Sequence, residues 1–126
     1  MCPDKPAAPD SLEFSRSWLP HMAGMRPLYL AVQDGMPFSA RVLRGFDGIF
    51  VGGTLEWKLA SGERWVNLAH CCGVPCHIGR VGTGKRVRWA KRIGVDSIDS
   101  CLPLWSRDNL RQFDDAVNDP QLELIA

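Results

Sequence analysis

The chain has 126 residues, a formal net charge of +1, and hydrophobic and charged fractions of 45% and 23%, which are those of an ordinary globular domain. This composition excludes a polycationic or strongly acidic protein, so any affinity for nucleic acid must come from a local cluster of charges. No apolar run approaches the roughly 20 residues that span a bilayer, and the first ten residues lack the regions of a signal peptide. We therefore expect one cytoplasmic domain with a single hydrophobic core and no membrane partner.

The first 26 residues differ from the rest of the chain. Three prolines (Pro3, Pro6 and Pro9) fall within the first ten residues, which is typical of a mobile terminal segment. Residues 11–26 predict no more than a short helix. We expect residues 1–26 to form a partly disordered lead-in and residues 27–126 to form the folded domain.

Four short apolar runs follow, each closed by glycine or a polar residue: residues 28–32, 47–51, 74–78 and 94–98. Helical spacing of apolar residues separates them over residues 57–72 and 85–93, and a last amphipathic helix follows Asp108 as its N-cap. Apolar strands that alternate with amphipathic helices predict an α/β fold with about four parallel strands. The pattern leaves open whether this sheet is small and open or part of a closed barrel.

Glycines and polar residues stand at all four predicted strand ends: Gln33 and Asp34, Gly52 and Gly53, Gly79 and Arg80, and Asp99. Ligands of parallel α/β folds bind beyond the carboxyl ends of the strands. A carboxamide both donates and accepts hydrogen bonds, and a glycine pair exposes backbone, so this set suits the edge of a purine. The alternative is that glycine and aspartate stand there as ordinary turn residues.

A cluster of basic residues without an intervening acid follows the third strand: Arg80, Lys85, Arg86, Arg88, Lys91 and Arg92. On a helix, Lys85, Arg88 and Arg92 share one face, which could contact phosphates. The alternative is a solvated helix face whose charge is balanced by acids elsewhere.

The cysteines do not form a recognisable metal motif. Cys71, Cys72 and Cys76 cluster near His70 and His77, but the spacing is not that of two C-x-x-C knuckles. We expect structural cysteines in the core, and neither a metal nor a cofactor.

Three segments together resemble the tRNA-guanine transglycosylase superfamily. LAVQDGM (residues 30–36) is similar to its V-Q-G-G strand, and GFDGIFVGG (residues 45–53) to its G-F-D-G-x-x-I-G-G motif. IGRVGTGKRVRWAKRIGVDSIDSCLP (residues 78–103) is similar to its M-G-V-G-T-P segment, helix and R-G-I-D-x-F-D-C-V-L-P segment. The resemblance covers residues 27–110 and is greatest for phage and bacterial members thought to place 7-deazaguanines in DNA.

The resemblance implies a TIM barrel that exchanges guanine for a 7-deazaguanine through a covalent glycosyl-enzyme intermediate. It makes Asp99 the nucleophile and Gln33, Gly52 and Gly53 the base contacts, with Asp34 and Gly79 beside them. The basic residues expected on the nucleic-acid backbone are Arg80, Lys85, Arg86, Arg88 and Arg92. The alternative for Asp99 is that it caps the turn into Ser100 and Cys101.

Two features of the superfamily have no counterpart here. The D-S-G-G-F segment with the second catalytic aspartate is missing, and so is the zinc motif C-x-C-x-x-C that follows the nucleophile. A complete barrel needs about 250 residues, so we expect the C-terminal half of a TIM barrel. Such a chain would need a second copy or a complementary half-barrel subunit, with DNA favoured over tRNA as substrate. The alternatives are a non-catalytic remnant that binds nucleic acid or protein, and an unrelated open α/β domain.

Overall fold

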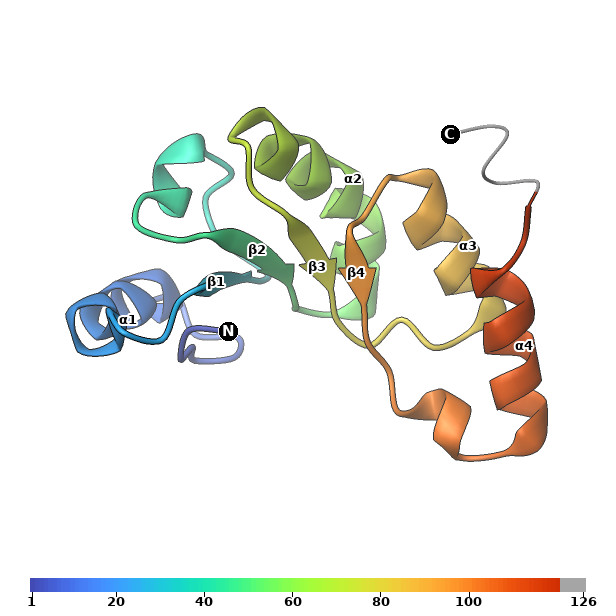
Figure 1. The fold of residues 1–126 in the computed structure, drawn as a ribbon. Helices are drawn as coiled ribbons and strands as arrows, with labels where there is room; N and C mark the ends of the chain where they lie inside the picture. The colour runs from blue at the N-terminus through green and yellow to red at the C-terminus, as the bar shows by residue number, and fades with distance from the viewer. Residues whose placement is uncertain (121–126) are drawn as a thin grey trace. The chain divides into compact units, whose positions relative to one another are not determined.

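A computed structural model describes residues 1–120 of the chain (Figure 1). Helices and strands alternate along most of it. In chain order they are α1 (Ser11–Trp18), the 3-10 helix η1 (Leu19–Met22), β1 (Tyr29–Val32), the 3-10 helix η2 (Ala40–Leu43), β2 (Gly48–Val51), α2 (Leu55–Cys71), β3 (Cys76–Ile78), α3 (Gly84–Arg92), β4 (Ser97–Ile98), the 3-10 helix η3 (Leu102–Leu104) and α4 (Arg107–Val117). The chain divides into two compact units, residues 1–77 and 78–126.

The four strands form one sheet in the order β1-β2-β3-β4, which is also their order along the chain. β1 and β2 pair in parallel, with Leu30 opposite Ile49 and Val32 opposite Val51. The prediction of an α/β fold with a four-stranded parallel sheet is confirmed. None of the predicted strands is missing, although the third is shortened from residues 74–78 to Cys76–Ile78 and the fourth from residues 94–98 to Ser97–Ile98.

In the first unit, α2 covers the strands with an apolar stripe. Trp65, Val66 and Ala69 on this helix are buried, as are Leu30 and Ile49 on the strands. Their spacing along α2 is that of one helix face, which is why residues 57–72 could be predicted as a helix. Thr54 caps the helix, because its hydroxyl accepts a hydrogen bond from the backbone N–H of Trp57.

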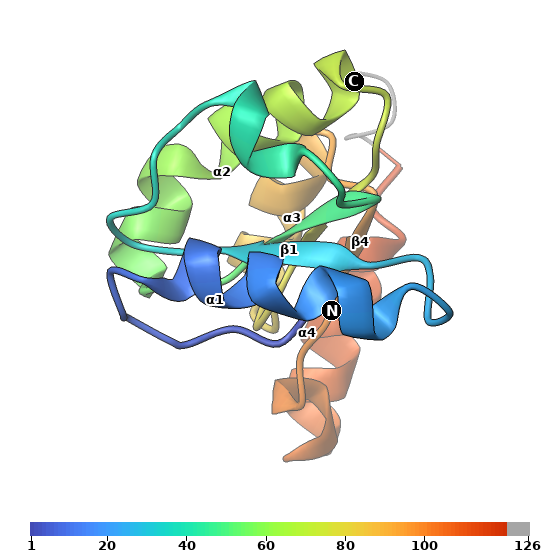
Figure 2. The same ribbon diagram turned by 90° about the vertical axis from the view of Figure 1, so that its left-hand side faces the viewer.

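The lead-in lies beside β1 in the same unit (Figure 2). The N–H of Cys2 donates to the carbonyl of Tyr29 at 2.8 Å. The Cys2 thiol donates to the carbonyl of Ser15 at 3.3 Å, and the Ser15 hydroxyl donates to the carbonyl of Pro3 at 2.8 Å. The structure thus gives α1 and a set of fixed contacts to residues that the sequence predicts to be partly disordered.

In the second unit, α3 and α4 pack together, and η3 precedes α4. Val87 and Ala90 form the buried face of α3. The N-cap of α4 is Ser106, whose hydroxyl accepts from the N–H of Asn109 at 3.1 Å. The prediction that Asp108 is this N-cap is wrong: Asp108 lies within the first turn and binds Arg111 at 2.6 Å.

We expect Gly53 and Gly52 to respond differently to the same substitution. Gly53 has φ +75°, and a Cβ there would lie 2.5 Å from Asp34 Oδ1 and 2.7 Å from the Trp57 ring. Gly53→Ala should therefore lower the free energy of unfolding by at least about 1–2 kcal/mol. In the matched control Gly52→Ala the new Cβ makes only an ordinary contact, 3.5 Å from the Val32 carbonyl. Urea unfolding measures both changes, and equal losses would contradict this account.

Candidate functional site

Gln33, at the carboxyl end of β1, is buried and fully engaged by the lead-in. The residue is 4% exposed. Its Oε1 accepts from the N–H of Ala7 at 2.7 Å, and its Nε2 donates to the carbonyl of Lys5 at 3.0 Å and to Ser11 Oγ at 2.8 Å. Both N–H donors of the carboxamide therefore have partners inside the protein. The sequence pattern gave no signal for this contact, because Ala7 and Gln33 are 26 residues apart.

Asp34, the next residue, fastens β1 to the start of α2. Its Oδ1 accepts from the backbone N–H of Thr54 and its Oδ2 from the Thr54 hydroxyl, both at 2.7 Å. The hydrogen bond from this hydroxyl is the main reason why the pKa of Asp34 is lowered. Thr54 was absent from the predicted site. A threonine directly before a helical stretch is a typical N-cap residue, and this signal could have indicated Thr54.

The two glycines at the end of β2 differ in their roles. The N–H of Gly52 donates to the carbonyl of Val32 at 2.9 Å and thus continues the sheet. Gly53 has a positive φ in a space too small for a side chain, closed by Asp34 and Trp57. Steric fit alone therefore accounts for a glycine at position 53, whereas position 52 has room for a Cβ.

These residues of the first unit meet at one place. Val32 and Val51 are opposite each other, so the residues after them, Gln33 and Gly52, follow neighbouring strands. A cavity of about 20 Å³ adjoins Gln33 and Asp34, closed on the other side by Ala8 and Ser11. The four predicted base contacts of this unit, Gln33, Asp34, Gly52 and Gly53, are thus brought together.

In the second unit, Asp99 binds the loop that follows β3. Its Oδ1 accepts from the backbone N–H of Arg80 at 2.9 Å, and its carbonyl accepts from the N–H of Val81 at 2.7 Å. Arg80 has φ +60°, a left-handed conformation that residues with a side chain rarely adopt. The predicted neighbours Gly79, Arg80 and Asp99 are therefore brought together, with the Asp99 side chain exposed.

Ser100 makes a bond within the turn that follows Asp99. Its Oγ accepts from the N–H of Leu102 at 3.1 Å. A Cβ on Gly82 would overlap this hydroxyl and the Leu102 side chain. The loop between β3 and α3 therefore lies directly against residues 100–102.

Part of the basic cluster on α3 is used inside the second unit. Arg88 Nε donates to Asp119 Oδ2 at 3.0 Å, and Lys91 Nζ donates to the carbonyl of Val117 at 2.8 Å. Among the described residues, no partner is found for the exposed side chains of Lys85 and Arg92, and Arg86 is half-buried. The exposed face of α3 that is available to phosphate is therefore narrower than the sequence suggests.

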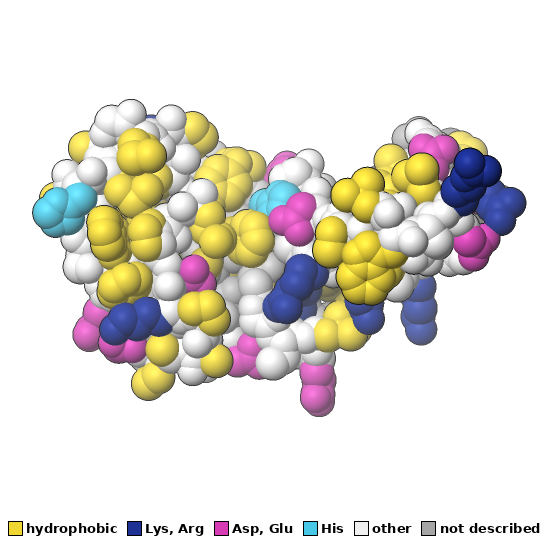
Figure 3. All heavy atoms as spheres, turned by 90° about the horizontal axis from the view of Figure 1, so that it is seen from below, with side chains coloured by type: hydrophobic (Ala, Val, Ile, Leu, Met, Phe, Trp, Pro, Cys, Tyr) yellow, Lys and Arg dark blue, Asp and Glu magenta, His cyan; other side chains and the backbone are white. Residues whose placement is uncertain are grey.

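On the surface shown in Figure 3, acidic and basic side chains are interspersed rather than segregated.

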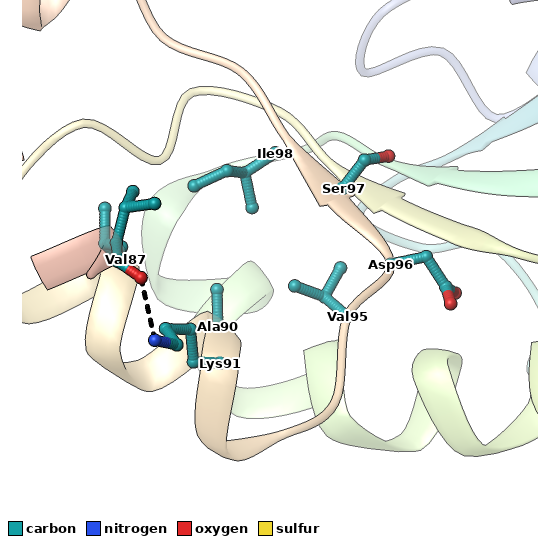
Figure 4. A pocket seen from close by; sticks show the side chains of 8 residues that line it. Val87, Ala90, Lys91, Val95, Asp96, Ser97 and Ile98 are labelled. Carbon is teal, nitrogen blue, oxygen red and sulfur yellow. Dashed lines mark hydrogen bonds between the residues drawn. The ribbon is translucent and has the colours of Figure 1, made fainter. Parts of the chain in front are cut away.

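A second cavity, absent from the sequence-based predictions, lies between α3, β4 and the end of α4 (Figure 4). Its volume is about 210 Å³. Val87, Ala90, Val95 and Ile98 turn toward it, whereas Asp96 points away. An apolar lining of this kind offers little for a charged or strongly polar ligand.

The histidines and cysteines do not gather into a metal site. Within residues 1–120, no group of three or more His, Cys, Asp or Glu side chains is placed to hold a metal ion. Cys76 is buried, as predicted, but Cys71 and Cys72, at the end of α2, are exposed.

Among residues 1–120, none of the helices has the length and apolar character needed to cross a membrane.

The lowered pKa of Asp34 predicts a pH-dependent contribution to stability. A carboxyl whose pKa is lower in the folded state stabilises the fold above its unfolded pKa of about 3.9, and this contribution disappears as pH falls through the folded pKa. Asp34→Asn should therefore cost up to about 1 kcal/mol at pH 7, small because the group is exposed, and less at pH 3. Urea unfolding at both pH values measures the difference, with Thr54→Val completing a double-mutant cycle. A cost that is the same at both pH values would refute the assignment.

Comparison of the chain with protein-family models, with curated proteins and with solved structures found no match. The resemblance to the transglycosylase superfamily is therefore carried by the three sequence motifs alone.

Proposed function

We propose that the chain is one part of a guanine transglycosylase that acts on DNA, with Asp99 as the nucleophile. The observation that carries the proposal is that each unit brings its own motif residues together at strand ends. In the first unit these are Gln33, Asp34 and the glycine pair, and in the second unit they are Gly79, Arg80 and Asp99. Neighbouring parallel strands bring their ends together in any such sheet, and the support for the proposal is that the residues standing there are those of the three motifs.

The strand order supports a barrel origin. The sheet runs β1-β2-β3-β4 without reversal, which is the order of consecutive strands in a TIM barrel. Doubly wound folds instead reverse their strand order at a switch point, where their ligands bind. A half TIM barrel is therefore the architecture that we propose, completed by a second copy or by a complementary subunit.

The proposed chemistry has two steps. An oxygen of the Asp99 carboxylate bonds to C1′ of the nucleotide, and the C1′–N9 bond breaks with its electron pair moving onto guanine, which takes up a proton. N9 of the incoming 7-deazaguanine, after losing its proton, then bonds to C1′ and displaces the carboxylate. Covalent catalysis of this kind divides one difficult displacement into two easier ones.

Both proton transfers need an acid or base near the departing and incoming rings. The resemblance places that group in the missing D-S-G-G-F segment, so a partner half is needed to supply it. In this proposal the chain is inactive alone, carries no cofactor, and works on nucleic acid in the cytoplasm.

A second candidate function is a non-catalytic module that binds nucleic acid. The observation that favours it is that both key side chains already have structural partners. Gln33 is bonded to the lead-in, and Asp99 is bonded to the backbone of Arg80. A fold that retains these residues for stability alone would look the same at these two places.

Asp99→Asn separates the two candidates. Asparagine keeps the Oδ1 acceptor for the Arg80 N–H, so the fold should survive, but it is not a competent nucleophile. With the partner half added, the variant should lose the covalent adduct with guanine-containing DNA, and base exchange should fall by several orders of magnitude. A denaturing gel detects the adduct, and Asp96→Asn is the matched control because Asp96 lies on the same short segment. Exchange by Asp99→Asn at the wild-type rate would exclude the catalytic role.

DNA binding should depend on the exposed part of α3. Each phosphate contact contributes a slope of about −0.9 to the plot of log K against log salt concentration. Lys85→Ala combined with Arg92→Ala should therefore flatten the slope by roughly two units, as measured by fluorescence anisotropy with a DNA duplex. Arg111→Ala is the control, because that residue is paired with Asp108 on α4. Arg88 is unsuitable for this test, since its loss would also release Asp119. Absence of binding at low salt would remove nucleic acid from the proposal.

A further inference from the structure

The turn around Ala7 meets Gln33 in the manner of a ligand. One acceptor, the carbonyl of Lys5, and one donor, the N–H of Ala7, bind the same carboxamide at 3.0 and 2.7 Å. The lactam edge of guanine presents the same pair, a carbonyl oxygen beside a ring N–H. A carboxamide satisfies such a pair with two parallel hydrogen bonds.

The turn leaves no room for a base beside Gln33. Gln33 is 4% exposed, and the adjoining cavity of about 20 Å³ has room for about one water molecule. A planar purine could reach the carboxamide only after the Lys5–Ala7 backbone had moved away. The turn and a base therefore exclude each other at this place.

The turn is held by contacts on both sides, and its middle residue has a strained backbone. On one side, Cys2 is completely buried and bonded to the carbonyl of Ser15. On the other side, the ammonium of Lys5 binds Asp10 at 2.7 Å and lies 4.9 Å from the centre of the Phe14 ring. Ala7 itself has φ +58°, a conformation in which the Cβ of an L residue crowds the following carbonyl oxygen. The strained residue of the segment is thus the one whose N–H contacts Gln33.

We propose that residues 5–8 form an internal latch that competes with guanine for Gln33, so that the base site opens only when this turn is displaced. The proposal rests on the base-reading role given to Gln33 under the proposed function. The apparent affinity for guanine is then the intrinsic affinity multiplied by the fraction of molecules in which the latch is open. A substitution that raises the fraction of molecules with an open latch must therefore strengthen guanine binding, and one that lowers this fraction must weaken it.

Two substitutions at one position shift the latch in opposite directions. Ala7→Pro removes the N–H that Gln33 accepts, and proline cannot adopt a positive φ, so the latch opens. Ala7→Gly keeps the N–H and adopts the same φ without strain, so the latch closes more tightly. Relative to the wild-type chain, we expect guanine to bind at least about fivefold more tightly to Ala7→Pro and about threefold more weakly to Ala7→Gly.

Binding is measured on the full chain with guanine as the probe, by saturation-transfer NMR. Hydrogen exchange of the peptide that contains residues 1–12 reports independently whether the latch has opened. Gln33→Leu in the Ala7→Pro background is the control, and it should abolish the gained affinity. Should Ala7→Pro fail to fold, Ala7→Gly still decides the question, because an unchanged guanine affinity in that variant overturns the latch.

The possible failures are distinguishable. If all three chains bind guanine equally although hydrogen exchange differs, the latch is refuted and the base site stands. If none binds guanine, even with the latch open, the base-reading role of Gln33 is refuted together with the latch that depends on it. The same conclusion follows if the Gln33→Leu control keeps the full affinity.

Discussion

The parallel register of β1 and β2 determines where every candidate residue of the first unit lies. With Val32 opposite Val51, the chain leaves both strands at the same level, and the residues that follow must share a small space. Asp34 then reaches the backbone and hydroxyl of Thr54, which starts α2 at a fixed point. A shift of one residue would turn Leu30 and Val32 to the face of the sheet that Ala31 now occupies, so side-chain packing also keeps this register.

Carboxylates that fasten one strand to the next recur in this fold. Asp34 binds the N–H of Thr54 after β2, and Asp99 binds the N–H of Arg80 after β3. Asp47, before β2, binds the N–H of Leu28 before β1 at 2.8 Å, and this bond is the main cause of its lowered pKa. Charge-assisted hydrogen bonds to backbone N–H groups are among the stronger ones. An aspartate in these motifs therefore has a structural role whether or not it also has a chemical one.

Much of the fold could be predicted from the sequence because burial leaves a periodic pattern. The apolar stripe of α2 and the short runs that become β1 and β2 are local signals, and their order implies a parallel sheet. The hydrogen bonds of Gln33 with the Lys5 carbonyl and the Ala7 N–H could not be predicted, because a proline-rich segment has no periodicity that indicates its partner. The error at Asp108 has a simpler cause: Ser106 and Asp108 are both good N-cap residues, and only the backbone decides between them. For the candidate site, the sequence indicated the residues at the strand ends but not what each of them binds.

The unequal space around Gly52 and Gly53 affects how the motif should be interpreted in evolution. A glycine at position 53 is required by the backbone and by the closeness of Asp34 and Trp57, so selection for folding alone would preserve it after any catalytic activity had been lost. Position 52 is under no such steric restriction. Among descendants of this chain, drift at position 52 would therefore indicate relaxed selection on the base site, whereas a persistent Gly53 would indicate only that the protein still folds.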